Sequence, residues 1–141
     1  MDEGFRYLEH VTDAYVEAYG HSLSEAFDYA GRALVNLMFD IGSVSGQIPI
    51  TIRTEGIDEI ELLYNWLEKV LLAILIEGHI MSEFKVCIYF KSKYVLEARA
   101  MTESLDTIKH GYRTEVKGIT YHAMEVTQFR DSVKTRFIVD L

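Results

Sequence analysis

The chain has little cysteine, little proline and no long apolar run. Its 141 residues include one cysteine, Cys87, and one proline, Pro49. A lone cysteine excludes an intramolecular disulfide and a zinc site built on several cysteines, which suits a reducing compartment. The longest apolar stretch, VLLAILI at 70–76, is far shorter than the ~20 residues of a membrane-spanning helix, and no basic and apolar leader opens the sequence. We therefore expect a cytoplasmic protein without membrane association.

Basic residues are also in the minority. The chain has 14 lysines and arginines against 22 aspartates and glutamates, which gives a net charge of -8. Because binding to a nucleic-acid backbone normally needs a basic surface, direct nucleic-acid binding is disfavoured as the main function, and only a local basic patch is left open. A hydrophobic content of 49% is typical of a folded protein. The length predicts one domain over residues 1–141.

Apolar periodicity predicts an α+β fold, in which two helices pack against a largely antiparallel β-sheet. Each helix has the start of a capping box, Ser22 with Glu25 and Asp58 with Glu61, whose side chains satisfy free backbone N–H groups. Pro49 places its strand at a sheet edge or at a bulge. The expected elements are strands at 5–7 and 14–19 joined through 9–12, a helix over 23–38, a strand at 48–52, a helix over 58–74, and strands at 84–90, 94–101, 116–126 and 132–139.

The sequence lacks several motifs of catalysis. It has no GxxxxGKS or GxxxxGKT phosphate loop, no GxGxxG after a strand, no GxSxG elbow and no HExxH pair. The five histidines are scattered along the chain, and His122, in a predicted strand, is interpreted as a hydrogen-bonded structural residue. Cys87 alternates with lysine and tyrosine, which favours a partly buried, inert thiol.

Two aspartates form the exception. Asp13 precedes a predicted strand, and Asp140 ends the last one, next to Leu141. If these strands pair, the two carboxylates and an oxygen of Leu141 converge. Crowded carboxylates repel each other unless a cation relieves them, and Ca²⁺ or Mg²⁺ prefers such oxygen ligands. From the residues alone, however, a turn-forming or capping role remains the favoured interpretation of such aspartates.

Five ordered blocks of the sequence resemble the archease family. EHVTDAYVEAYG is similar to the block around the family's EHTAD motif, and EVKGITYHAMEV to its EVKAVTYHGLEV strand. LSEAFDYAGRALVNLMFD and LLYNWLEKVLLAIL resemble its two helices, and FIVDL its acidic C-terminal end. The resemblance extends from Tyr7 to Leu141. Gly118 and Ala123 depart from the commoner residues of the strand motif, as do the two residues before Asp13 in the opening one.

The resemblance implies a function that the pattern alone does not. Archeases are small α+β proteins that are not ligases themselves. They promote guanylylation and multiple turnover of the RtcB-type tRNA-splicing ligase, which joins tRNA exon halves with GTP and a divalent metal. The resemblance implies a metal site at Asp13, Asp140 and Leu141, with Ca²⁺ favoured over Mg²⁺ or Mn²⁺, and His10 beside it. It also implies a functional role for Lys117, in contact with an anionic group of the partner or its nucleotide, although a solvated strand lysine is a close alternative.

Two other functions remain open at this stage. A metal-dependent hydrolase or nuclease would use the same carboxylates and a cation to activate water, but the sequence offers no evident general base. A chaperone-like module would bind other proteins through an apolar patch. The activator hypothesis predicts a transient protein–protein contact with the ligase and only indirect involvement of tRNA.

Overall fold

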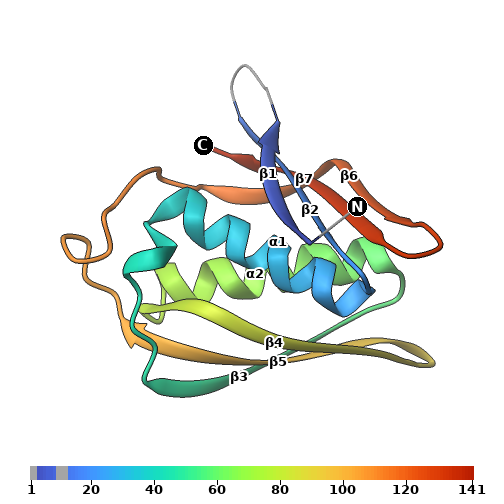
Figure 1. The fold of residues 1–141 in the computed structure, drawn as a ribbon, viewed down its shortest axis with the longest axis horizontal. Helices are drawn as coiled ribbons and strands as arrows, with labels where there is room; N and C mark the ends of the chain where they lie inside the picture. Colours follow the sequence, from blue (N-terminus) through green and yellow to red (C-terminus); the bar gives the residue numbers. More distant parts are fainter. Residues whose placement is uncertain (1–2, 9–12) are drawn as a thin grey trace.

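Two helices lie between two antiparallel β-sheets, so that the molecule has three layers (Figure 1). The structure is a computed structural model and describes residues 3–8 and 13–141. The predicted link at 9–12, with His10 in it, lies outside the described residues. The elements are β1 (Gly4–Leu8), β2 (Ala14–Gly20), α1 (Leu23–Met38), η1 (Ile41–Ser43), β3 (Ile48–Gly56), α2 (Glu59–Leu75), β4 (His79–Lys91), β5 (Lys93–Ser104), β6 (Gly118–Gln128) and β7 (Val133–Asp140).

The predicted α+β class is confirmed, and the strands divide between two sheets instead of forming one. The first sheet has the order β1-β2-β7-β6, and the second has the order β3-β5-β4. The division follows from α2, which is apolar around much of its circumference and contacts both β6 and β3. A helix with such a wide apolar surface must be covered on two sides, and one sheet covers only one. Within the described residues, neither helix combines the length and the apolar character needed to cross a membrane.

Both helices begin where the capping boxes predict. The Ser22 hydroxyl accepts a hydrogen bond of 3.1 Å from the Glu25 amide, and the Asp58 carboxylate accepts one of 2.8 Å from the Glu61 amide. Each bond satisfies a backbone N–H group that the first helical turn leaves without a partner. The glutamate of each box in turn accepts a hydrogen bond from the backbone N–H of the residue before the cap, His21 or Ile57.

Trp66 of α2 joins the layers of the core. Its indole Nε1 donates a hydrogen bond of 2.8 Å to the carbonyl oxygen of Phe27 in α1, and its ring packs edge-on against Phe84 of β4 at 5.3 Å between centroids. Gly31 permits this approach, because a Cβ atom there would lie 3.0 Å from the Trp66 ring. Both helices are thereby fixed to the second sheet as well as to each other.

The second sheet has two protected edges. Pro49 lies in β3, an edge strand, as its missing N–H predicts. The opposite edge is β4, which has an irregular register between Met81 and Glu83 and lies along α1. The Ser24 hydroxyl of α1 accepts a hydrogen bond of 3.0 Å from the Ile88 amide of this edge. Helix α1 therefore supplies an acceptor that a further strand would otherwise provide.

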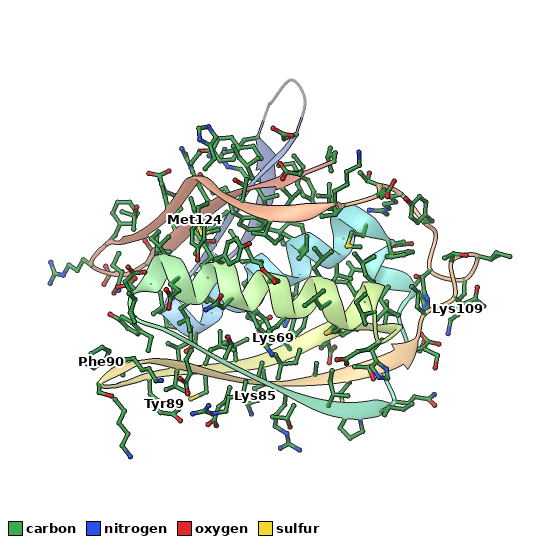
Figure 2. The ribbon with its side chains drawn as sticks, turned by 180° about the vertical axis from the view of Figure 1, so that it is seen from behind. Lys69, Lys85, Tyr89, Phe90, Lys109 and Met124 are labelled. Atoms are coloured by element: carbon green, nitrogen blue, oxygen red, sulfur yellow. The ribbon has the colours of Figure 1, made fainter. Side chains whose placement is uncertain are left out.

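Strand β6 contains a pronounced bulge. Its register against β7 shifts between Thr120 and Glu125, and Ala123 has a φ of 56°. Figure 2 shows Met124, the next residue, between β6 and α2, where it packs against the core. The bulge overturns one sequence prediction. His122 is exposed, and its ring makes no hydrogen bond within the described chain, because the bulge turns it away from the core.

Cys87 also differs from its prediction. It is exposed and not partly buried, because it lies on the side of β4 that faces away from the helices, like Lys85 and Tyr89 (Figure 2). Outward positions on this strand are uncovered, since this sheet is an outer layer and no other described element packs on that side.

Candidate functional site

One end of the first sheet brings the predicted site residues together. Ala14 of β2 pairs with Val139 of β7, and Asp140 pairs with Gly118 of β6. Asp13 directly precedes Ala14, so that one further step in the same register sets Asp13 opposite Asp140. Residues directly opposite each other on antiparallel strands project to the same face. The two carboxylates therefore share one face of the sheet, although 126 residues lie between them in the sequence.

This face is the outer one. Phe137 and Val139 are buried in the core, and side chains alternate along a strand, so Asp140 projects away from the helices. Asp140 and Leu141 are exposed, and Asp13 is half-buried. Figure 1 shows the end of β7 close to the hairpin formed by β1 and β2. The carboxylates thus lie at a solvent-accessible corner of the sheet.

Lys117 reaches the same corner through its backbone. Its N–H donates a hydrogen bond of 2.8 Å to the carbonyl oxygen of Asp140, which places it directly before β6. The Lys117 side chain is exposed and makes no hydrogen bond or ion pair with any described residue. The sheet pairing therefore gathers all four predicted positions, Asp13, Asp140, Leu141 and Lys117, at one place.

A row of charged side chains lies on the same face of the sheet, further along the strands from the corner. Glu17 lies on the same face of β2 as Asp13 and is only 3% exposed. Its carboxylate accepts hydrogen bonds from Arg6 Nε at 2.7 Å and from Arg136 Nε at 2.8 Å. Burial raises the pKa of Glu17, but the two arginine hydrogen bonds outweigh it, and the net pKa is below the ordinary value. Arg136 also shares a hydrogen bond with Tyr15, which lies between Glu17 and Asp13 on the strand.

This row of charged side chains was not predicted from the sequence. Arg6, Glu17 and Arg136 are adjacent only because β1, β2 and β7 pair in register. The one sequence signal is a glutamate in the middle of a strand that is otherwise largely apolar. If the carboxylate of such a glutamate is buried, it requires a basic partner.

The donor set at the corner consists of hard oxygens. Two carboxylates and the main chain of Leu141 suit Ca²⁺, which takes several oxygen ligands in flexible geometry. Neither a cysteine nor a histidine belongs to the set as described, so that it lacks the ligands that zinc prefers. The arrangement can hold a hard divalent cation at the surface, with positions left over for ligands from another molecule.

A second group of potential ligands is a weaker candidate. Glu3, His21 and Glu25 place one ligand atom each within 4.8 Å of one another, at the far end of β2. Glu25 already accepts hydrogen bonds from the His21 backbone and from His21 Nδ1, the latter at 2.9 Å. The group also lies at the positive end of the α1 dipole, which disfavours a cation.

Comparison with known proteins identifies the family. The profile of the "Archease protein family (MTH1598/TM1083)" matches residues 5–141. The chain belongs to the archease family. The resemblance predicted from the sequence blocks is therefore confirmed.

Relatives named archease match nearly the whole chain. The archease of Pyrococcus furiosus is 37% identical over 128 residues, which cover 90% of each chain. The archease of Sulfolobus acidocaldarius is 34% identical over 137 residues, which cover 97% of this chain and 98% of the relative.

Solved structures share the archease fold. The solution structure of protein 1598 from Methanobacterium thermoautotrophicum superposes with a TM-score of 0.85 at 33% identity, covering 98% of this chain and 99% of the other. A crystal structure from Thermotoga maritima, described as an archease and possible chaperone, has a TM-score of 0.60 at 18% identity, with coverage of 95% and 94%. At 18% identity, the second structure supports a shared fold and nothing further.

Proposed function

We propose that this archease is a non-catalytic activator of an RtcB-type tRNA-splicing ligase in the cytoplasm. It would promote guanylylation and multiple turnover of the ligase through a transient protein–protein contact. The proposal is supported by one observation above all, the gathering of Asp13, Asp140, Leu141 and Lys117 at an exposed corner of the first sheet. The net charge of -8 fits an indirect involvement with tRNA better than direct binding.

In this proposal a divalent metal, Ca²⁺ in preference to Mg²⁺ or Mn²⁺, binds at the corner. Asp13 and Asp140 contribute carboxylate oxygens, and Leu141 contributes a main-chain oxygen. Ca²⁺ is favoured because ligands from two strands and a chain segment after β7 suit its flexible geometry better than the strict octahedron of Mg²⁺. A bound cation would relieve the repulsion between the carboxylates and attract oxygen ligands of the partner or its nucleotide.

Lys117 has a separate role in the proposal. Its backbone N–H binds the carbonyl oxygen of Asp140 at the corner, and its side chain is exposed. A lysine there would contact a phosphate or carboxylate of the partner as a mobile point charge. Lys117→Met keeps the length of the side chain and removes the charge, so that it should lower activation without weakening metal binding.

A guanylylation assay tests the proposal. Purified ligase and labelled GTP are mixed with and without the archease, and the label on each chain is followed over time. We expect faster labelling of the ligase and none of this chain. Asp13→Asn and Asp140→Asn should lose the acceleration. Asp131→Asn, an exposed aspartate in the turn between β6 and β7, is the matched control and should retain it. Full acceleration by both corner variants would contradict the site.

The two alternative functions give different results. Hydrolysis of GTP or RNA by the isolated chain would favour a metal-dependent hydrolase or nuclease. A chaperone-like role has one observation in its favour, because Ile76 and Ile108 are 76% and 91% exposed. The Thermotoga protein is itself described as a possible chaperone. Suppression of the aggregation of unrelated unfolded proteins, lost in Ile76→Ser with Ile108→Ser, would favour that role.

A further inference from the structure

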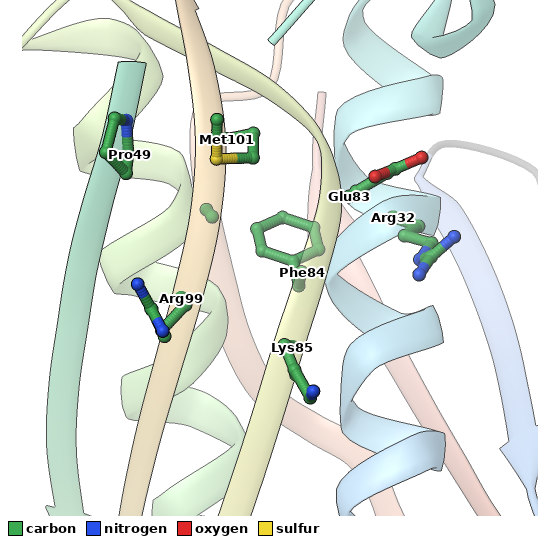
Figure 3. Close-up of a pocket in the computed structure, with 8 residues that line it drawn as sticks. Arg32, Pro49, Glu83, Phe84, Lys85, Arg99 and Met101 are labelled. Carbon is green, nitrogen blue, oxygen red and sulfur yellow. The ribbon is translucent and has the colours of Figure 1, made fainter. Parts of the chain in front are cut away.

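The second sheet has a cleft of about 390 Å³ on the layer opposite to the corner site. Figure 3 shows Arg99 of β5 and Lys85 of β4 on adjacent strands, with Pro49 and Met101 along one side. The volume lies in the range of small-molecule sites. This cleft is far from the carboxylates of the corner, since the helix layer separates the two sheets (Figure 1).

Two cationic residues are register partners in the cleft. Lys85 and Arg99 are directly opposite in the register of β4 and β5, and both are exposed. Like charges at directly opposed positions destabilise a sheet. Neither side chain has a hydrogen bond or an ion pair with any residue that the structure describes. The sheet therefore carries a local repulsion that its own side chains leave uncompensated.

Neighbouring basic residues are compensated, in contrast. Arg53, on the same face of β3, pairs with Glu55 at 2.8 Å and with Glu97 at 3.7 Å. Arg32, at the rim of the cleft, pairs with Asp28 at 2.7 Å. Lys85 and Arg99 differ from these two arginines, because neither pairs with a carboxylate of the described residues. An anion from outside the chain would compensate both charges.

The surroundings of the two cations define that anion further. Thr51 is the partner of Arg99 on the β3 side and is exposed, so a hydroxyl joins the guanidinium and the ammonium in one row across the sheet. Such a row of donors matches the oxygens of a phosphate group, to which arginine can donate two hydrogen bonds. The next row holds Pro49, Met101 and Glu83, of which the first two offer an apolar surface to the rest of a ligand.

We propose that the cleft binds the phosphate group of a small phosphorylated ligand, with Lys85 and Arg99 on the phosphate and Pro49 and Met101 against the attached group. Glu83 also lines the cleft, and its carboxylate lies on the side of Arg32, away from Lys85 and Arg99 (Figure 3). The site is independent of the ligase hypothesis, since its test uses this chain alone.

Inorganic pyrophosphate is the probe for the test. The protein is first treated with EDTA, so that chelation of a metal by pyrophosphate has no effect on the corner site. We expect millimolar pyrophosphate at low salt to raise the Tm and to shift the amide resonances of residues 84–86 and 99–101. Lys85→Gln and Arg99→Gln should each weaken binding by about tenfold or more, because each removes a charge-assisted hydrogen bond.

Arg53→Gln is the matched control, since it removes an arginine from the same face that already has carboxylate partners. It should bind pyrophosphate like the unchanged protein. Without ligand, Lys85→Gln should be at least as stable as the unchanged protein, because it relieves the repulsion from Arg99. An equal response of all four proteins, or no response of the unchanged protein, would overturn the proposal.

A comparison of GTP with pyrophosphate tests whether the bound phosphate group belongs to a nucleotide. GTP that binds more tightly than pyrophosphate, with resonance shifts extending to the Met101 side chain, would assign the site to a nucleotide. Equal affinities for the two would assign it to the phosphate group alone. RNA oligonucleotides that bind more tightly than both, with a dependence on length, would overturn a small-ligand site.

Discussion

Arg136 of β7 donates a hydrogen bond of 2.8 Å from Nε to the carboxylate of Glu17, its register partner on β2. Arg6 of β1 binds the second oxygen of the same carboxylate, so that one buried acid joins three strands. The pair lies four residues along β2 and β7 from the corner that carries Asp13 and Asp140. The charged row therefore fixes the relative position of the strands that present the site.

Glu17→Gln should destabilise the protein by about 1–3 kcal/mol, because it leaves two arginines without the buried carboxylate that joins them. Urea unfolding measures the change in the free energy of unfolding. Glu97→Gln is the control, since this carboxylate is half-exposed and pairs with the exposed Arg53. It should cost no more than about 0.5 kcal/mol. Equal losses in the two variants would show that Glu17 has no special role.

The stability of the protein should depend on the protonation of Glu103. Hydrogen bonds from Lys109, His110 and the Ser45 amide lower the pKa of Glu103 from 4.5 to about 2. Because the pKa is lower in the folded state, Glu103 contributes stability above pH 4.5, and the contribution is lost as the pH falls from 4.5 towards 2. The unfolding free energies of the unchanged protein and Glu103→Gln should differ at pH 6 and converge near pH 2. A constant difference over this range would contradict the assignment.

Ala123→Gly should stabilise the protein. Ala123 has a φ of 56°, a left-handed conformation that costs a residue with a Cβ atom about 1–2 kcal/mol. Glycine removes this cost but loses more conformational entropy on folding, so we expect a net gain of about 0.5–1 kcal/mol. Thermal or urea unfolding measures it. Ala100→Gly, in the regular strand β5, should have the opposite sign. A loss of stability in Ala123→Gly would show that the bulge favours alanine for another reason.

Calcium should stabilise the unchanged protein after EGTA treatment. A ligand that binds only the folded state adds about 2.7 kcal/mol at 100 times its Kd, so the Tm should rise with Ca²⁺ concentration. Asp13→Asn and Asp140→Asn should need at least about tenfold more Ca²⁺ for the same rise, because each loses a charged ligand. Asp131→Asn should respond like the unchanged protein. Identical titrations for all variants would exclude the corner as the metal site.

Local patterns predicted much of the fold. Ser22 and Asp58 marked the helix starts because capping depends on residues only three positions apart. Pro49 indicated an edge strand because it lacks an N–H group. The division into two sheets could not be predicted in this way, since the pairing of β3 with β5 depends on contacts across α2. The bulge in β6 was missed for a similar reason, because the side chains of Tyr121 and Met124 fit the surface of α2.

The histidines show the same limit of prediction from local sequence. Sequence position favoured His122 as the structural histidine, but His110 has that role. His110 is fully buried, accepts a hydrogen bond of 3.0 Å at Nδ1 from the Asp106 amide, and contacts Glu103 through Nε2 at 2.9 Å. It belongs to the segment between β5 and β6, where apolar residues show no regular spacing. The sequence therefore offered no indication that His110 is buried. The gathering of Asp13 and Asp140, in contrast, could be stated as a hypothesis, because it needed only one strand pairing.

The two edges of the second sheet have a consequence for behaviour in concentrated solution. An open strand edge is a template on which another copy can add, and repeated addition leads to fibres. Here Pro49 withholds a donor from one edge, and Ser24 of α1 occupies the Ile88 amide on the other. Both features disfavour the addition of a second copy of the chain at the edges of this sheet.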